Sequence, residues 1–600
     1  MDIEDIIIKR KYIHDEKKVI SLITDLVNTI GKTNNILSMD ELNNIFTIMK
    51  RKHSVQPCKS QMRTLIEEYF PKELVNISLK RWLIKRIMRS ESGVIVYTIV
   101  TKPGNNIKFS CPEKCAYCPT ETDKQGNPTQ PKSYISSEPA MIRATQNNFD
   151  IGDQINDRTR SYLYTGNIKK DNKEKKIEVI LSGGTWDVMP KNYRDVVINE
   201  IYYNFNIINN KKRSMLSLDE EKKINETAIF RVIGLTIETR PDYVTKKSLL
   251  EYLEYGVTRV QLGGQSTHDD ILLKIKRGCT NKNMITAIRL LKGIGMKVVT
   301  HWMPDLPGSS PKRDYEMFEN LINNSDLQSD DWKIYPCAVV KSYTEELIIK
   351  SDINDWYNDG SYIPYAEINI NDLKNLLIDI KQKVKPWVRI ERLVRDIPTK
   401  SIEVGYNKIT NLRQIIKDEM NKNNLKCKCI RCMEIKDKSS LINQGKIVVR
   451  KYKASKGIEY HITFEIEKYY WTISYIIYCI LYFLNIKYYY SGNDKLYNGL
   501  FGFLRLRIDS NPGLDLVPEL VDCGLIREVH VYGISTSVGD NIIKSSQHKG
   551  IGQKLMKVAE EIIKLNNLNK AAVIAGIGAR EYYKNKCGYK LDKYYMIKKL

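Results

Sequence analysis

Between about residue 95 and residue 400, short apolar runs alternate with stretches of helical pattern such as "NKNMITAIRLLKGIG". This alternation is typical of parallel strands joined by right-handed helical crossovers. It predicts an α/β fold, either a barrel or a doubly wound sheet. Glycine and polar residues crowd the carboxyl ends of the runs, where parallel α/β folds hold their sites. The runs are 177–185, 231–240, 258–266, 297–305, 332–340 and 388–396.

Three cysteines, Cys111, Cys115 and Cys118, form a C-x3-C-x2-C array in "SCPEKCAYCPTET". A closed zinc or iron–sulfur site normally takes four such ligands. Three thiolates on one loop can hold three irons of a 4Fe–4S cluster and leave the fourth iron open to a substrate. The array, with Tyr117 before its last cysteine, resembles the radical-SAM signature, in which that iron binds S-adenosylmethionine (SAM). The alternatives are a zinc site with a distant fourth ligand, or free thiols.

Further residues at the strand ends fit the same resemblance. Gly183, Gly184 and Thr185 end the run "IEVILSGGT", and radical-SAM barrels commonly have a Gly-Gly pair there that meets the methionine ammonium. A Gly-Gly turn alone also serves any tight turn. Glu238 and Arg240 end the following run and could bind ribose or carboxylate. Their alternative is an ordinary ion pair of the barrel.

The C-terminal stretch, from about 445 to 600, contains a strand-like run followed by Gln547, Gly550 and Gly552 at the start of a helical pattern. Glycines at a helix N-terminus bring backbone N–H groups close to an anion. The order resembles GNAT-type acetyltransferases, whose loop of this kind holds the pyrophosphate of coenzyme A. In that family a tyrosine lies by the thioester sulfur, and Tyr583 is the candidate, with Tyr582 next. The alternative is a tyrosine packed under the last strand.

A second triplet, Cys427, Cys429 and Cys432, reads C-x-C-x2-C. Spacing this close disfavours disulfides and favours a structural zinc ion acting as a staple between domains. Cys337 and His461 are both candidates for the fourth ligand, and the residues do not choose between them. The alternative is a set of reduced, metal-free thiols.

The charge of the chain favours a polyanionic partner. Lys and Arg number 95 against 71 Asp and Glu, a formal net charge of +24 over 600 residues. Such an excess attracts nucleic acid, although a composition rich in Lys, Asn, Ile and Tyr, as AT-rich coding gives, also inflates it. Residues 1–90 have a basic helical pattern, which fits RNA contact or a solvated helical face equally well.

Two features bear on the cellular compartment. Twelve cysteines, six of them in two triplets, are typical of metal sites in a reducing environment. The N-terminus lacks the apolar core of a signal peptide. The apolar segment 471–486 has 16 residues, fewer than the ~20 that a membrane span needs. We therefore expect a cytoplasmic protein without a membrane span, and an insertion or a replacement at 468–490.

A radical-SAM triplet and a GNAT-type loop in one chain is a rare pairing. Together with "SGGTWDVMPKNYRD", "GLTIETRPDY", "RGCT", "MPDLPG" and "EYYKNKCGY", it resembles the catalytic subunit of Elongator, the tRNA uridine(34) acetyltransferase family. The resemblance spans roughly residues 60–600. It implies a tRNA-modifying enzyme that uses a 4Fe–4S cluster, SAM and acetyl-CoA to build a carboxymethyl group on C5 of uridine 34, with accessory Elongator-type subunits as partners.

The resemblance also implies site residues. Cys111, Cys115 and Cys118 would hold the cluster. The residues implied to contact acetyl-CoA come from the barrel and from the C-terminal domain. They are Lys176, Glu528, Val529, His530, Val531, Ile551, Gly552, Gln553 and Tyr583.

The expected organisation is a basic helical tRNA-binding region at 1–92, a partial TIM-like radical-SAM barrel at 93–400, a zinc-binding linker at 401–445 and a GNAT domain at 446–600. One alternative function is acetyl transfer to a protein lysine, with a structural cluster and Glu528 as the base. Another is a tRNA-binding subunit without activity.

Overall fold

The computed structural model describes most of the chain. It covers residues 16–31, 37–55, 57, 59–71, 77–83, 93–103, 111–168, 173–208, 212–406, 409, 411–435, 439–467, 497–532 and 550–600. Gln547 and the stretch 468–490 lie outside the described residues. Within the ranges above, no helix is long and apolar enough to cross a membrane.

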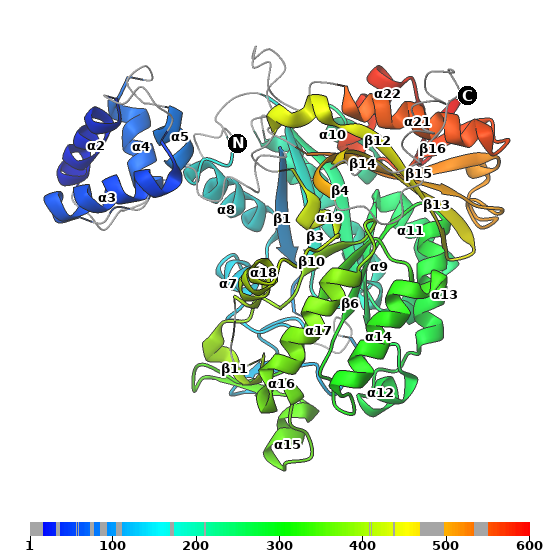
Figure 1. The fold of residues 1–600 in the computed structure, drawn as a ribbon, viewed down its shortest axis with the longest axis horizontal. Helices are drawn as coiled ribbons and strands as arrows, with labels where there is room; N and C mark the ends of the chain where they lie inside the picture. The colour runs from blue at the N-terminus through cyan, green and yellow to red at the C-terminus, as the bar shows by residue number, and fades with distance from the viewer. Residues whose placement is uncertain are drawn as a thin grey trace.

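The N-terminal helices form a module beside the rest of the molecule (Figure 1). Buried side chains such as Leu22, Leu26 and Trp82 give the module a core of its own. A capping box starts its second helix, because Ser38 and Glu41 each accept a hydrogen bond from the other's backbone N–H. The helices are α2 (Glu16–Gly31), α3 (Met39–His53), α4 (Lys59–Tyr69) and α5 (Ile77–Leu83).

Seven parallel strands form the central sheet, and their order in space follows their order along the chain. A doubly wound sheet would reverse its strand order at a switch point, so the sequential order selects the barrel alternative. The sheet curls into an open half-barrel (Figure 1). Its strands are β1 (Val94–Val100), β3 (Lys175–Ser182), β4 (Phe230–Thr239), β5 (Arg259–Gln265), β6 (Lys297–Trp302), β7 (Asp331–Ile334) and β10 (Arg389–Arg392).

Alternation along β3 separates the helix-covered face of the sheet from the interior. In β3, Ile177, Val179 and Leu181 are buried in the main apolar core, whereas Glu178 and Ile180 line an interior cavity. This is the period-2 pattern of a strand with two different faces. The helices packed around the sheet are α7 (Pro139–Gln146), α8 (Ile151–Tyr164), α9 (Lys191–Ile207), α10 (Leu218–Asn225), α11 (Lys246–Tyr255), α12 (Asp269–Lys274), α13 (Asn281–Gly293), α14 (Pro311–Asn323) and α17 (Ile370–Lys383).

Smaller elements border the half-barrel. Two short antiparallel pairs, β2 with β9 and β8 with β11, lie outside the main sheet. Two helices then lead towards the C-terminal sheet. These elements are β2 (Thr120–Asp123), β8 (Ala338–Val340), β9 (Leu347–Lys350), α15 (Asp352–Asn358), α16 (Tyr365–Ile368), β11 (Ile402–Gly405), α18 (Leu412–Lys422) and α19 (Ile430–Met433).

A second sheet of seven strands follows, in the order β12-β13-β14-β15-β16-β18-β17. All neighbouring strands are antiparallel except β15 and β16, which run parallel and are joined through helix α21 (Ile551–Leu565). Helix α22 (Arg580–Cys587) precedes the last hairpin. The strands are β12 (Lys446–Ala454), β13 (Gly457–Glu467), β14 (Tyr497–Ile508), β15 (Cys523–Val531), β16 (Lys570–Val573), β17 (Lys590–Asp592) and β18 (Tyr595–Lys599).

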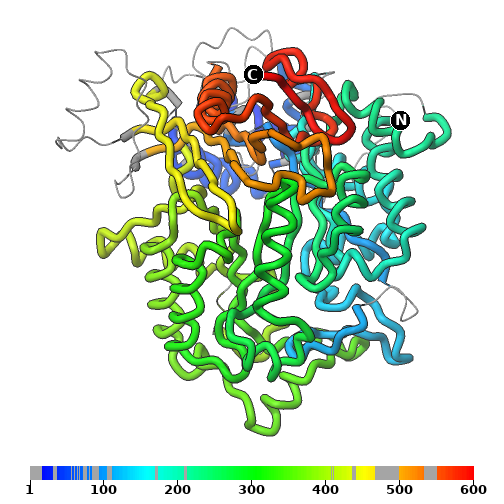
Figure 2. The backbone as a smooth tube through the Cα atoms, turned by 90° about the vertical axis from the view of Figure 1, so that its right-hand side faces the viewer, coloured from blue at the N-terminus to red at the C-terminus, as the bar shows by residue number. Residues whose placement is uncertain are grey.

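The C-terminal elements lie across one end of the barrel, as Figure 1 and Figure 2 both show in orange and red. The contacts identify this end as the amino ends of the barrel strands. Tyr595 donates a hydrogen bond to the Ile294 carbonyl at 2.8 Å, just before β6, and Leu514 packs where a Gly293 side chain would stand. Because Leu514, Leu525 and Tyr595 belong to the main barrel core, the two sheets share one apolar interior.

Gly576, in the segment that follows β16, packs directly against β4 of the barrel. A Cβ atom at this residue would stand 2.0 Å from the Ile233 carbonyl oxygen on β4. That oxygen is backbone, so rotation of a side chain cannot relieve the overlap. We expect Gly576→Ala to lower the free energy of unfolding by about 1–3 kcal/mol, measured by urea denaturation of the full chain.

Gly234→Ala, on β4 next to Ile233, is the control. Its added Cβ would make only an ordinary contact, 3.6 Å from Glu178 Cγ. Equal destabilisation by the two substitutions would contradict the steric explanation.

Candidate functional site

The first cysteine loop lies against the segment that follows α12. Ala116 N donates to the Ile275 carbonyl at 2.9 Å, and Cys118 N donates to the Cys115 carbonyl at 2.9 Å. Cys115 is buried, whereas Cys111 and Cys118 are half-buried. Burial raises the pKa of the Cys118 thiol to about 12, so this sulfur is protonated at neutral pH unless a cation compensates its charge.

Two buried arginines approach Cys115. Arg277 Nη1 lies 3.5 Å and Arg240 Nη1 lies 3.9 Å from its sulfur. Arg240 also forms an ion pair with Asp242 at 2.9 Å. Guanidinium groups directed at a sulfur suit a thiolate rather than a thiol, so this environment fits an anionic, thiolate-bound cluster.

The Gly183–Gly184 turn lies beside the cysteine loop. Both glycines have positive φ, +145° and +91°, and a Cβ at Gly183 would overlap the Thr101 hydroxyl at 1.9 Å. Thr185 is buried directly after them. Gly184 faces the backbone of Lys132, and the Lys132 ammonium donates to the Cys111 carbonyl at 3.4 Å. The turn is thus connected to the cysteine loop through one lysine.

Glu238 and Arg240 point to different surroundings, and neither pairs with the other. Glu238 accepts a hydrogen bond from the Tyr134 hydroxyl at 2.8 Å and lines the interior cavity. Arg240 turns towards Cys115 and Asp242. The alternative of an ordinary ion pair therefore holds for Arg240, which pairs with Asp242 and not with Glu238.

One cavity of about 1730 Å³ runs along the interior of the half-barrel. Tyr117 of the cysteine loop lines it, as do Glu238 and His301 near the carboxyl ends of the strands. Glu528 and Tyr583 of the C-terminal domain line it at the amino ends. The cavity therefore connects the two motif-bearing regions, whereas the strand pattern alone predicted a site at the carboxyl ends.

Basic side chains line this cavity, and sequence reasoning did not single them out. Lys333 donates to Gln261, which also lies 3.0 Å from His301 Nε2. Burial lowers the pKa of His301 well below its usual range, so the ring is neutral near pH 7. The run "VRIERLVRD" was the one sequence feature that could have pointed to this basic lining, because several of its residues are arginines. The remaining basic residues are Arg143, Arg158, Arg259, Lys297, Arg389, Arg392, Arg395, Arg413, Arg431 and Arg527.

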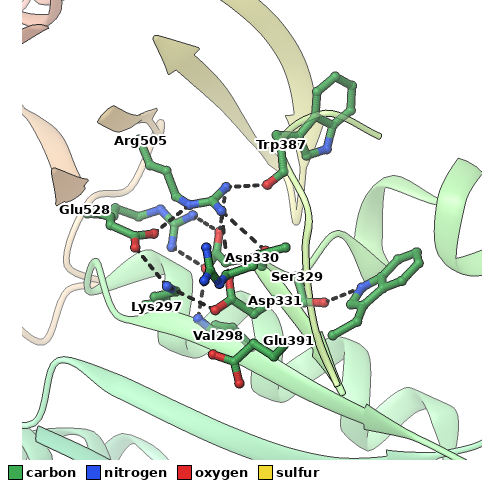
Figure 3. Close-up of polar contacts among 12 residues, drawn as sticks. Lys297, Val298, Ser329, Asp330, Asp331, Trp387, Glu391, Arg505 and Glu528 are labelled. Carbon is green, nitrogen blue, oxygen red and sulfur yellow. Dashed lines mark hydrogen bonds and ion pairs between the residues drawn. The ribbon is translucent and has the colours of Figure 1, made fainter. Parts of the chain in front are cut away.

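Glu528 is held by two cations at the junction of the sheets (Figure 3). Its carboxylate lies 2.8 Å from Lys297 Nζ and 2.8 Å from Arg505 Nε. Burial opposes ionisation, but these cations outweigh it and lower the pKa of Glu528 to about 2. So weak a base does not suit the deprotonation of a lysine at neutral pH.

The start of α21 adjoins the point where two strands separate. The ladder between β15 and β16 ends at Ile526 and Val573, and β15 continues beyond it to Val531. Gly550 caps α21 with φ +70°, and a Cβ at Gly552 would stand 2.7 Å from the Tyr582 hydroxyl. Gly552 thus lets another side chain come close to the backbone at this helix start, where N–H groups favour an anion.

The other residues implied for acetyl-CoA lie on several elements. Val529 and His530 line the cavity, and Ile551 is buried. Gln553, on the first turn of α21, donates to the Lys586 carbonyl at 2.9 Å. Lys176 lies on β3 opposite Arg231 of β4, the strand against which Gly578 packs.

Tyr583 is buried on α22, and its ring lies 5.3 Å from that of Tyr582. Burial raises the pKa of Tyr583, so its hydroxyl remains a proton donor across the physiological range. The residue lines the cavity. A tyrosine that only packs under the last strand would not need to do so.

The second triplet converges. The sulfurs of Cys427, Cys429 and Cys432 all lie within 4.8 Å of one another. Hydrogen bonds from Cys427 and Cys429 lower the pKa of Cys432. Lys381 Nζ donates to the Cys432 sulfur at 3.4 Å. This sulfur-rich cluster with an adjacent cation suits a soft metal ion.

Both candidates for the fourth zinc ligand are wrong, because neither belongs to this group of sulfurs. Cys337 is buried in another apolar cluster, with Ala116 and Leu306. His461 is buried on β13, with its ring 5.4 Å from that of Phe503.

Comparison with known proteins identifies two domains and several relatives. The Radical SAM superfamily matches residues 105–321, and the Radical_SAM C-terminal domain matches residues 329–422. The tRNA uridine(34) acetyltransferase of Dehalococcoides mccartyi (strain CBDB1) is 34% identical over 523 residues, 86% of this chain and 100% of the relative. Elongator complex protein 3 of Homo sapiens is 31% identical and covers 86% of this chain and 85% of its own length.

A solved structure agrees with this result. The archaeal Methanocaldococcus infernus Elp3 with an N-terminal deletion superposes with a TM-score of 0.64 at 31% identity, covering 85% of this chain and 100% of that one.

The ion pairs of Glu528 predict a pH-dependent stability. A carboxylate whose pKa falls from 4.5 to about 2 on folding stabilises the folded state above pH 4.5, and this contribution disappears as the pH falls towards 2. We expect Glu528→Gln to cost about 3 kcal/mol at pH 7 and progressively less between pH 4.5 and pH 2, measured by urea unfolding. Glu346→Gln, on the exposed surface, is the control. A cost independent of pH would contradict the ion-pair explanation.

Proposed function

Because this chain belongs to the family of tRNA uridine(34) acetyltransferases and Elongator complex protein 3, we propose that it carboxymethylates C5 of the wobble uridine of tRNA, with acetyl-CoA as the source of the new carbons. The observation that carries the proposal is the single cavity lined by Tyr117 of the cysteine loop and by Tyr583 of the C-terminal domain. Such a cavity lets one substrate group react with another that is bound by a different domain.

The cysteine end would hold the radical-generating cofactors. Cys111, Cys115 and Cys118 would bind a 4Fe–4S cluster, and the turn of Gly183, Gly184 and Thr185 would bind SAM, with Glu238 near its ribose. When bound, these cofactors would supply a 5′-deoxyadenosyl radical able to remove a hydrogen atom from the acetyl methyl, the carbon that would become the methylene of the carboxymethyl group. The protein's own part is to orient the groups and exclude water.

The C-terminal sheet would bind acetyl-CoA in the manner of GNAT acetyltransferases. The parallel pair β15 and β16, with α21 between them, supports this assignment. The N-terminus of α21, from Gly550 to Gln553, would bind the pyrophosphate. Residues 528–531 and Lys176 would lie along the coenzyme, and the Tyr583 hydroxyl would donate a hydrogen bond at the thioester.

The basic cavity wall would receive the anticodon loop. Lys333, Arg392 and Arg395 line it, and arginine and lysine neutralise phosphates and position a nucleic acid. An unstacked loop base is the part of an RNA most accessible to a deep site. The basic helices at 1–92 would add backbone contacts, and accessory Elongator-type subunits are the expected partners.

The proposed domains have the boundaries that the sequence predicted. We propose 93–400 as the radical-SAM barrel, 401–445 as a linker and 446–600 as the acetyltransferase domain. A zinc ion held by Cys427, Cys429 and Cys432 would stabilise the linker between the two domains. Because Lys381 is the neighbour that the structure puts beside these sulfurs, its charge would balance that of the thiolates.

Acetyl transfer to a protein lysine is the weaker alternative. That reaction needs a base for the amine, and the Glu528 carboxylate is held in two ion pairs with its pKa lowered to about 2.

The test is reconstitution of the full chain without oxygen, using iron, sulfide, SAM, acetyl-CoA and bulk tRNA, followed by mass spectrometry of nucleosides. We expect 5-carboxymethyluridine from the native chain. We expect none from Cys115→Ala, because the loss of one thiolate opens the cluster. Cys523→Ala, which removes a buried cysteine at the start of β15, is the control and retains the product. Acetyl-lysine in place of the modified nucleoside would favour the alternative.

The role of the Tyr583 hydroxyl can be tested separately. Tyr583→Phe keeps the ring and removes the proton donor, and we expect a loss of product of about 10²-fold with acetyl-CoA binding retained in calorimetry. Tyr589→Phe is the control, because the Tyr589 hydroxyl bonds Glu560 at 3.0 Å instead of lining the cavity. Equal activities of the two variants would show that the Tyr583 hydroxyl has no role in the reaction.

A further inference from the structure

Arg277, in the "RGCT" segment, has no role in the assignments above. Its side chain is 95% buried, with 5% of its surface exposed. One nitrogen, Nη1, lies 3.5 Å from the Cys115 sulfur, and another, Nη2, donates to the Gly263 carbonyl at 2.6 Å. The third, Nε, is buried without a hydrogen-bond partner. A guanidinium buried this deeply requires an anion nearby.

No carboxylate of the described chain forms an ion pair with Arg277. The neighbouring Arg240 differs, because Asp242 binds it through both carboxylate oxygens, at 3.0 and 2.9 Å. Arg240 and Asp242 therefore add almost no net charge at Cys115, whereas Arg277 adds a full positive charge.

The backbone fixes this arrangement. Gly263 makes room for the guanidinium, since a Cβ there would stand 2.9 Å from Arg277 Nη2. Two residues before Arg277, the Ile275 carbonyl accepts a hydrogen bond from Ala116 N, next to Cys115. The arginine and the cysteine are thus held together by main-chain contacts as well as by their side chains.

We propose that Arg277 is the fixed cationic partner of the cluster-bound Cys115 thiolate, and that its charge raises the reduction potential of the cluster. This inference rests on the proposed 4Fe–4S site. Reduction adds one electron from an external donor and so increases the negative charge beside the guanidinium. A buried cation stabilises the reduced form more than the oxidised form, because attraction is strong where water is excluded.

The test is a redox titration of the reconstituted full chain with dithionite, followed by electron paramagnetic resonance of the reduced cluster. We expect Arg277→Gln to shift the reduction equilibrium about tenfold towards the oxidised form, which is 59 mV for one electron. Arg277→Lys keeps the charge and should remain within threefold of the native value. The double variant R240Q/D242N removes one cation and one anion together and should also stay within threefold.

Every variant is also tested for iron and sulfide content and for thermal unfolding. These measurements distinguish a change of potential from loss of the cluster or of the fold. Loss of the cluster in Arg277→Gln but not in Arg277→Lys also supports the charge role. An unchanged potential in Arg277→Gln overturns the proposal, and so does loss of the cluster or misfolding in both variants, which would assign Arg277 to backbone geometry. Absence of a cluster from the native chain would instead contradict the proposed function.

Discussion

A buried network of charges around Asp330 fixes how the two sheets meet. Arg527 of β15 binds both Asp330 oxygens, at 2.6 and 3.0 Å, and also the Glu459 carboxylate at 2.9 Å. Arg505 joins the same group directly, through an ion pair with Asp330 at 3.6 Å, and it also binds Glu528 (Figure 3). These side chains are almost fully buried, so separating the sheets would strand charges away from water. Such a network contributes little net stability compared with apolar packing. Its consequence is a single relative orientation.

That orientation creates the cavity. Because the C-terminal sheet covers the amino ends of the barrel strands, the interior of the half-barrel is walled at both ends, by the cysteine loop at one and by β15 and α22 at the other. The charges that hold the sheets also decide the local chemistry. Lys297 and Arg505 keep Glu528 ionised, whereas burial keeps His301 neutral. The cavity therefore has fixed ion pairs at the junction, and deeper inside a neutral imidazole beside Lys333.

The sequence predicted the features that depend on neighbouring residues. Strand–helix alternation predicted parallel strands with helical crossovers but left a barrel and a doubly wound sheet both open, and each cysteine triplet was visible as a motif. Contacts between distant residues were not predictable: Arg527 and Asp330 are 197 positions apart, and only the fold makes them partners. The same reason explains the error over Cys337 and His461, which were chosen by type, not by position in space. Glu238 and Arg240 diverge because β4 ends at Thr239, so Arg240 lies beyond the alternation of the strand.

Charge and shape depend on each other at the junction of the sheets. The ion pairs form only if the backbones come close, and small residues allow that approach: Gly576 meets the Ile233 carbonyl, and Gly578 meets Arg231. Conversely, apolar contact alone would tolerate sliding, whereas a guanidinium bound through two nitrogens to two carboxylates does not. Because Arg527 forms such contacts, a small displacement breaks several bonds at once. The cavity can therefore keep its dimensions while large substrates enter and leave it.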